Sequence, residues 1–230
     1  MSEEEVAEMK KYVCVFCDDR KNVDSAYIIN NGIGICRTCF EKLNKTSLSL
    51  PYKGEKDVSY IMSPFEYTSE IRNVILDFKF NNCRAYAPLM ADMMKEYLDS
   101  YDIWDNFDCI IPVPLHKKRL RDRGYNQSEL IAKYAAEYIG LKMRADILER
   151  VRATDKQSKL IRTERVLNVK NAFKCSEDIS GMKILLFDDI CTTGNTLAAC
   201  ASALKQAGAA KICALTFAIH AEQKLPFITY

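Results

Sequence analysis

The sequence lacks any long apolar run. None of its 230 residues belongs to an uninterrupted apolar stretch near the length of about eighteen that crosses a bilayer, so no membrane span is predicted. The first eleven residues, MSEEEVAEMKK, are acidic and have no apolar centre. They therefore fit neither a secretory signal nor a transit peptide, and we expect a cytoplasmic protein.

The sequence also lacks a marked excess of charge of either sign. Its 33 Lys and Arg residues face 31 Asp and Glu residues, for a net charge of +2. The overall charge therefore points to neither a nucleic-acid nor a membrane partner. Any anion-binding surface must come from local clustering of cations.

Two common nucleotide-binding motifs are missing. No Gly-Lys-Thr or Gly-Lys-Ser follows the turn around Gly194, which excludes a Walker loop. Gly32-Ile-Gly34 has neither the third glycine nor the following helix of a dinucleotide fingerprint. A phosphate site in this chain must therefore be built in another way.

The composition that is present is that of an ordinary globular protein, with 48% hydrophobic and 28% charged residues. A chain of this length buries a full core, and its natural division is one α/β domain with a small additional module. We expect the module at residues 1–50, a helical linking or hood region at 51–107 and the α/β domain at 108–230.

Two Cys-x-x-Cys pairs, Cys14-Val-Phe-Cys17 and Cys36-Arg-Thr-Cys39, are separated by eighteen residues. This is the spacing of a four-cysteine zinc site, because each pair folds two thiolates onto one side of a tight turn. Between the pairs, Asn31-Gly32 is a strong hairpin signal that brings them together. A redox role for one pair does not explain two copies at this interval. We therefore predict a zinc ribbon with these four cysteines as ligands.

The predicted zinc is structural. With four thiolate ligands the site has no open position for a catalytic water. Metal binding also supplies stability that a segment of about forty residues lacks. The other cysteines of the ten lie singly in apolar segments, as reduced, small hydrophobic residues do. They are Cys83, Cys109, Cys175, Cys191, Cys200 and Cys213.

Two helices are predicted after a polar, turn-rich linker at residues 50–64. Apolar residues recur at helical spacing over Tyr67–Phe80, and a second stretch, Tyr86–Tyr101, has one broad apolar face. Lys79, at the end of the first helix, would face either solvent or a ligand. The spacing alone does not decide between these two positions.

The chain is organised around residues 184–196, ILLFDDICTTGNT. Ile184–Phe187 have the makeup of a buried parallel strand and end at Asp188 and Asp189, while a helix is predicted over Leu197–Ala207. Ligands bind at the carboxyl ends of such strands, and a helix N-terminus there offers N–H groups to an anion. Carboxylates repel phosphate, so the acids suit sugar hydroxyls or a divalent cation. The stretch therefore predicts a site for a phosphorylated sugar.

This stretch resembles the phosphoribosyl diphosphate (PRPP) loop of type I phosphoribosyltransferases. An apolar strand, two acids, two further residues and Thr-Thr-Gly-x-Thr follow in the family's order, and only Cys191 departs from the usual aliphatic residue. The resemblance makes Asp188 and Asp189 the catalytic, ribose-binding residues and gives the 5′-phosphate to the loop. That loop comprises Thr192, Thr193, Gly194, Asn195 and Thr196. The alternative, an acidic turn with a threonine cap, does not explain an ordered match of thirteen residues.

A cluster of cations follows a second predicted strand, residues 109–115. The segment His116–Gly124, HKKRLRDRG, has five Lys and Arg residues against one Asp. If the strands are parallel, the cluster lies at the same edge as the acids and gives an anion a charged wall. We predict that Arg123 and Gly124 contact pyrophosphate, because glycine lets the backbone approach an anion.

The remaining cations of this segment have two possible roles. They contact DNA or pyrophosphate, or they form an exposed basic patch, and some of them must be the latter. These residues are Lys117, Lys118, Arg119 and Arg121. His116 is more often a structural turn histidine than an acid or base.

The order of these segments resembles the competence protein F (ComF) family, whose members join a zinc-binding N-terminus to a phosphoribosyltransferase-like domain. PVPLHKKRLRDRGYNQSELIA and residues 152–173 carry the match, which extends over residues 12–218. The resemblance implies an α/β fold, with a type I phosphoribosyltransferase-like parallel sheet flanked by helices and a small N-terminal zinc-ribbon module. In that fold residues 150–165 form a loop that brings Lys156, Lys159 or Arg162 toward a leaving pyrophosphate.

Two functions from different classes follow from the resemblance. In the first, the protein binds PRPP or a related sugar phosphate and acts in DNA uptake in natural transformation. It would bind single-stranded DNA through the zinc module and the basic turn, with a competence helicase-like protein as a partner. In the second, it transfers a 5-phosphoribosyl group from PRPP, with Mg²⁺, to a nitrogen base and releases pyrophosphate. The sequence identifies no acceptor site, and a purely structural adaptor does not explain the Asp-Asp and Thr-Thr-Gly sequences.

Overall fold

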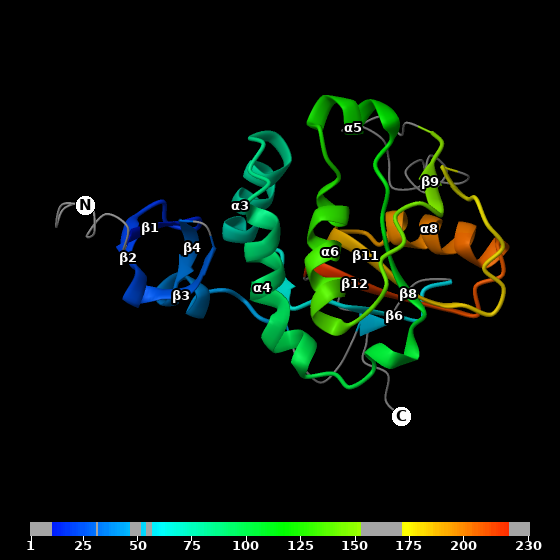
Figure 1. Cartoon of the computed structure of the whole chain (residues 1–230), viewed down its shortest axis with the longest axis horizontal. Helices are drawn as coiled ribbons and strands as arrows, with labels where there is room; N and C mark the ends of the chain where they lie inside the picture. Colours follow the sequence, from blue (N-terminus) through cyan, green and yellow to red (C-terminus); the bar gives the residue numbers. More distant parts are fainter. Residues whose placement is uncertain (1–10, 31, 47–51, 54–56, 153–171, 221–230) are drawn as a thin grey trace.

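The computed structural model describes residues 11–30, 32–46, 52–53, 57–152 and 172–220. Their centre is a twisted sheet with the strand order β5-β6-β12-β11-β8, in which β7 also pairs with β12 (Figure 1). β11 is parallel to β8 and β12, and β6 and β7 are parallel to β12, whereas β5 is antiparallel at the edge. The strands are β5 (Tyr52–Lys53), β6 (Tyr60–Met62), β7 (Phe65–Glu66), β8 (Cys109–Pro112), β11 (Lys183–Cys191) and β12 (Lys211–Ile219).

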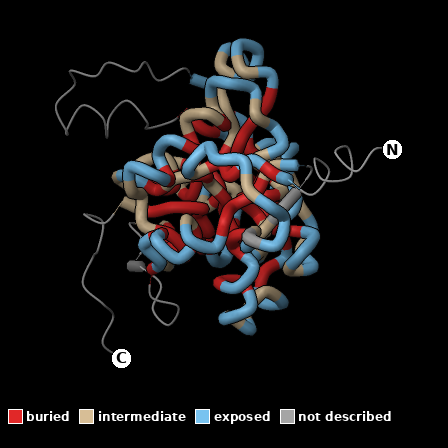
Figure 2. The backbone as a smooth tube through the Cα atoms, turned by 90° about the vertical axis from the view of Figure 1, so that its left-hand side faces the viewer, coloured by how far each residue is buried: buried red, intermediate tan, exposed pale blue. Residues whose placement is uncertain are grey.

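Helices cover both faces of this sheet. Leu185 and Phe187 of β11 pack in one core cluster with α3, α4 and α6, and Ile184 and Leu186 pack in another with α8. Side chains alternate across a strand, so a strand buried on both faces is a continuous apolar run. The helices are α3 (Ser69–Phe80), α4 (Tyr86–Asp99), α6 (Gln127–Ile139) and α8 (Asn195–Gln206). Figure 2 shows the buried residues gathered in the interior of the molecule.

These observations confirm the predicted fold class and correct two details. β11 continues through Asp188 and Asp189 to Cys191, so the acids lie inside the strand and not beyond its end. The predicted linker contains β6, which pairs in parallel with β12 and belongs to the main sheet. The shorter elements outside the main sheet are α5 (Lys117–Arg123), η2 (Trp104–Asn106) and the antiparallel pair β9 (Leu148–Arg150) and β10 (Phe173–Cys175).

The N-terminal module is a four-stranded sheet of order β2-β1-β4-β3, and its antiparallel β3–β4 pair is the predicted hairpin. It packs on two elements of the α/β part. The Phe40 ring meets the ring of Phe65, in β7, edge-on at 6.2 Å, and Lys45 pairs with Glu96 of α4 at 3.0 Å. Figure 1 shows α3 and α4 between this module and the rest of the chain. The module comprises β1 (Lys11–Cys14), β2 (Arg20–Asn22), η1 (Val23–Ser25), β3 (Ala26–Asn30), β4 (Ile33–Cys36) and α2 (Arg37–Glu41).

Within the described residues, no helix combines the length and the apolarity needed to cross a membrane.

Tyr97 joins α4 to the sheet, because its hydroxyl accepts a hydrogen bond of 3.1 Å from the backbone N–H of Ser63, a residue that is 0% exposed. Tyr97→Phe leaves that N–H buried without this acceptor. We expect the free energy of unfolding to fall by about 1–3 kcal/mol in urea denaturation. Tyr134→Phe, at an exposed position of α6, is the control and should change it by less than about 0.5 kcal/mol. Equal stability of the two variants would contradict the assigned role.

Candidate functional site

The acid pair and the cation cluster lie at one edge of the sheet. β8 and β11 are parallel, and the N–H of Val113, just after β8, donates to the carbonyl of Phe187 at 2.8 Å. Asp188 follows Phe187 directly, and α5 begins shortly after Val113. The expectation that both groups share the carboxyl edge is therefore confirmed.

Asp188 is held by two hydrogen bonds. The Ser128 hydroxyl, in the first turn of α6, donates to Asp188 Oδ1 at 2.7 Å, and the Asp189 backbone N–H donates to the same oxygen at 2.9 Å. Burial and the adjacent negative charge of Asp189 raise the pKa of Asp188 to about 7, although the Ser128 hydrogen bond and the charge of Lys79 oppose the shift. This carboxyl group therefore changes its charge near neutral pH.

Asp189 is the anion of a partly buried ion pair. Its Oδ2 lies 2.5 Å from Lys79 Nζ, and the two side chains are 9% and 21% exposed. Lys79 comes from the last turn of α3, so the pair joins the helical layer to the central strand. The structure thus places Lys79 against the acid pair and not in open solvent.

The bend after β11, residues 192–194, leads directly into α8. Gly194 has φ +68°, in the left-handed region that glycine adopts without a side-chain clash, and it precedes the first residue of α8. Gly194, the N-cap residue, has no side chain to accept from the first N–H groups of this helix, which face the bend. Thr192 is exposed, and Thr193, Asn195 and Thr196 are half-buried.

The cation cluster forms the short helix α5 and not an irregular turn. His116 is its N-cap, with Nδ1 accepting from the Lys118 N–H at 3.2 Å, which confirms the structural reading of this histidine. Gly124 ends the helix at φ +80°, and its carbonyl accepts from Arg84 at 3.0 Å. Lys117 pairs with Glu149 at 2.8 Å, an exposed contact.

Arg123 is one of two half-buried cations of α5, with Arg119. Its guanidinium donates to Gln127 Oε1, and its pKa is lowered by burial, an effect that the negative charge of Asp189 opposes. Arg123 and Lys79 thus carry positive charge beside Asp189.

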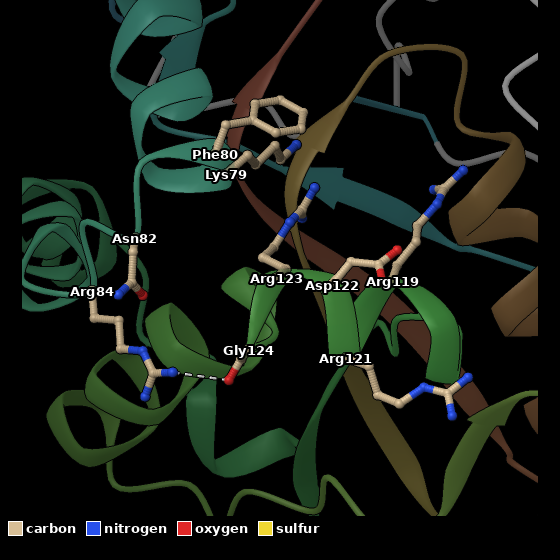
Figure 3. Close-up of a pocket in the computed structure, with 9 residues that line it drawn as sticks. All are labelled: Lys79, Phe80, Asn82, Arg84, Arg119, Arg121, Asp122, Arg123 and Gly124. Carbon is tan, nitrogen blue, oxygen red and sulfur yellow. Dashed lines mark hydrogen bonds between the residues drawn. The ribbon is translucent and has the colours of Figure 1, made fainter.

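A cavity of about 600 Å³ lies between the end of α3 and α5. Its walls include Lys79, Arg119, Arg121, Arg123 and Gly124, so it brings together most of the predicted basic residues (Figure 3). Its lining includes neither Asp188 nor Asp189, and it includes no residue of the bend. Lys117 and Lys118 also lie outside it. The acids and the bend thus form one group, and the cation-lined cavity adjoins it through Lys79 and Arg123.

Sequence reasoning missed several members of this edge. Ser128 holds Asp188. Arg150 of β9 is 8% exposed, and burial lowers its pKa, an effect that the negative charge of Asp188 opposes. Asn126 and Gln127 are also buried, and Asn126 donates to the Val113 carbonyl at 3.0 Å. The polar residues 126–128, which precede the apolar face of α6, were the signal in the sequence that could have indicated them. The loop residues Lys156, Lys159 and Arg162 lie outside the described residues.

The four cysteines of the two Cys-x-x-Cys pairs come together in the N-terminal module. The Sγ atoms of Cys14, Cys17, Cys36 and Cys39 all lie within 4.8 Å of one another. A Zn–S bond of about 2.3 Å places the sulfurs of a tetrahedral site about 3.8 Å apart, so this cluster fits a metal ion.

The pKa values of Cys14, Cys17 and Cys39 are shifted in different directions. Burial raises the pKa of Cys14, but backbone hydrogen bonds led by the Cys36 N–H outweigh it and bring the value to about 7. Burial raises the pKa of Cys17 and Cys39. Only a bound cation makes four adjacent thiolates stable, which is what a metal ion provides.

Comparison with known proteins identifies the family. Residues 126–228 match the model of the phosphoribosyl transferase domain. The chain is 38% identical to the DNA utilization protein YhgH of Salmonella typhi over 155 residues, which cover 66% of this chain and 68% of that protein. It is also 33% identical to competence protein F of Haemophilus influenzae over 153 residues, covering 64% and 66%. The chain belongs to the ComF family. A further ComF relative, competence protein ComFC of Bacillus subtilis, is 25% identical over 91% of this chain and 95% of its own length.

The raised pKa of Asp188 makes a pH-dependent stability prediction for this ComF chain. A folded-state pKa of about 7, against an ordinary 3.8, favours the protonated form in the folded protein. Its stabilising contribution is therefore complete below pH 3.8 and is lost as the pH rises through 7. Asn cannot ionise, so Asp188→Asn should gain stability relative to the wild type between pH 5 and pH 8. Urea denaturation at both pH values measures this gain.

Asp102→Asn, an exposed change before β8, is the control and should show no such trend. A difference between wild type and Asp188→Asn that stays constant with pH would contradict the pKa of Asp188.

Proposed function

We propose that this ComF-family chain binds PRPP or a related sugar phosphate beside the acid pair of β11, and acts in single-stranded DNA handling during natural transformation. One observation carries the proposal: Asp188, Asp189 and the uncapped start of α8 form one strand-bend-helix unit at the carboxyl edge of the sheet. Carboxylates suit ribose hydroxyls, and a helix N-terminus suits a phosphate. The unit thus has groups for both parts of a ribose 5-phosphate.

The acids would hold the ribose. Asp188 is half-buried and oriented by Ser128, so a ribose hydroxyl that donates to it meets an acceptor already in place. Asp189 is oriented in the same way by Lys79. The same carboxylates suit an Mg²⁺ ion that arrives with PRPP, and such an ion would neutralise part of the charge between ligand and protein.

The bend would hold the 5′-phosphate. Thr192, Thr193 and Thr196 supply hydroxyls, and the first N–H groups of α8 point toward the bend with the positive end of the helix dipole. Gly194 allows the sharp change of direction that places these groups on one side.

The pyrophosphate of PRPP would lie against the cations on the other side of the acids. Arg123 and Lys79 lie beside Asp189, and both line the adjoining cavity. A planar guanidinium binds phosphate oxygens in pairs, which favours Arg123 for this contact. Gly124, by contrast, has both backbone groups engaged, because its N–H donates to the Leu120 carbonyl at 2.8 Å and its carbonyl accepts from Arg84. It would therefore shape the wall of the cavity and leave the anion contact to Arg123.

The DNA part of the proposal is supported by the relatives and by α5. Of the three relatives described above, one is named for DNA utilization and two for competence. On α5 the exposed cations Lys117, Lys118 and Arg121 suit the phosphates of a strand that continues past the cavity. A competence helicase-like partner and a location in the cytoplasm stay predictions from the resemblance.

The metal of the N-terminal module is proposed to be zinc in a structural role. Four sulfur ligands favour Zn²⁺ among the common ions and leave no position for substrate. Cys14 and Cys36 are buried, and Cys36 lies at the start of α2, so the ion would fix the end of β1 against that helix.

The ligand test is thermal stability with PRPP and Mg²⁺. At a ligand concentration of about 100 Kd we expect the free energy of unfolding to rise by about 2.7 kcal/mol. Asp188→Asn with Asp189→Asn should abolish the accompanying rise in Tm, because the neutral side chains lose both the ribose acceptors and the charge that suits Mg²⁺. Scanning calorimetry with and without ligand measures it.

The control replaces two exposed acids before β8, Asp102→Asn with Asp105→Asn, and should keep the full rise in Tm. An unchanged wild-type Tm at millimolar PRPP and Mg²⁺ would contradict sugar-phosphate binding. The transferase alternative predicts in addition that pyrophosphate is released from PRPP when a nitrogen base is supplied.

For the metal, we expect about one zinc ion per chain by elemental analysis, following the four-thiolate stoichiometry. Cys14→Ser with Cys36→Ser should remove the ion and lower Tm, because the module loses the bond network that closes it. Cys175→Ser, outside the cluster, should keep the metal. Full zinc content in the double variant would exclude this site.

A further inference from the structure

The cavity between α3 and α5 has a feature that a pyrophosphate contact does not use. The ring of Phe80, the last residue of α3, lies on its wall and is 62% exposed. The apolar face of α3 that packs into the core is formed by Ile71, Val74, Ile75 and Phe78. Core packing therefore does not account for an aromatic residue at position 80.

Cations surround this ring. The Arg123 guanidinium lies 5.4 Å from the centre of the Phe80 ring, and Figure 3 shows Lys79 next to it. Arg84 and Arg119 line the cavity further along, and Asp122 is the one acid in the described lining. An aromatic face among cations is the combination that binds a base and its phosphates together.

Contacts between neighbouring residues hold part of the cavity wall in place. Arg84 donates to the Gly124 carbonyl at 3.0 Å and lies 5.0 Å over the Tyr125 ring, while the Tyr125 hydroxyl donates to the Phe78 carbonyl. These contacts join the end of α3 to the junction of α5 and α6. A ligand therefore meets a shape that needs little ordering, which favours binding.

We propose that this cavity binds one nucleotide of a single DNA strand, with the base stacked on Phe80 and the adjoining phosphates against Arg84 and Arg119. The proposal rests on the DNA part of the proposed function and gives it a residue-level site. The volume of about 600 Å³ lies within the range of about 300–1,000 Å³ of small-ligand sites. A base inside a duplex is stacked and paired, so only an unpaired base reaches this ring.

Arg121 offers the DNA strand a further phosphate contact next to the cavity. Figure 3 shows its side chain extending away from the other labelled residues, and it is exposed on α5. It therefore suits the phosphate of a neighbouring nucleotide, a contact that carries charge and no base preference.

The experiment compares two oligonucleotides with the same number of phosphates, oligo-dT and an abasic deoxyribose-phosphate strand of equal length. Phe80→Ala should weaken binding of oligo-dT about tenfold and leave the abasic strand unchanged, since stacking needs the base. Arg121→Ala should weaken both and reduce the slope of log K against log salt by about one. Tyr134→Ala, which removes an exposed aromatic residue outside the cavity, should change neither affinity.

A second variant gives a direct signal of stacking. Phe80→Trp should keep the affinity for oligo-dT and add a tryptophan fluorescence that oligo-dT quenches and the abasic strand does not. The wild-type chain has a single tryptophan, Trp104, so its own titration supplies the background. Quenching by both strands alike, or by neither, would overturn the placement of the base.

The outcomes separate this inference from the proposed function. If wild-type protein binds both strands equally and Phe80→Ala changes nothing, the stacking site is wrong and DNA binding stands. If wild-type protein binds neither strand at low salt, the DNA part of the proposed function fails with it. Binding of PRPP, measured by the rise in Tm, is independent of both results.

Discussion

The parallel pairing of β11 with β8 on one side and β12 on the other is the constraint on which the site depends. Parallel strands direct their carboxyl ends to the same edge, so the groups that follow each strand meet there. In this chain the acids of β11 meet the helix that follows β8. Neither group alone would make a site for a ligand that has both hydroxyls and phosphates.

Opposite charges meet at this edge under partial burial. Asp188 and Asp189 face Lys79, Arg123 and Arg150, which come from three different elements. Attraction between partly buried charges is stronger than at the surface. A charge left unpaired there would also destabilise the fold more than an exposed one. The acids therefore remain close to cations that suit a polyanion, although carboxylates alone would repel it. Under the proposed function, this balance would let one small region hold a sugar and its phosphates together.

The sequence predicts the parts of this site that depend on local pattern. Spacing was enough for the two Cys-x-x-Cys pairs and for α3, because a period of 3.6 and a fixed ligand interval are local properties. The end of β11 was placed too early, since pairing of Ile190 with Ala218 extends the strand past its apolar run. β6 is three residues long and too short to show a period. The contact of Lys79 with Asp189 depends on packing between distant segments, which no local pattern reports.

The N-terminal module and the α/β domain meet through apolar side chains. Phe40 and Leu43 belong to the same core cluster as Phe65 and residues of α4, and Val15 and Ile35 extend it into the module's own sheet. Apolar packing therefore crosses the predicted boundary between the module and the rest of the chain. Cooperativity follows: separating the two parts exposes apolar surface on both, so the chain is expected to unfold as one thermodynamic unit.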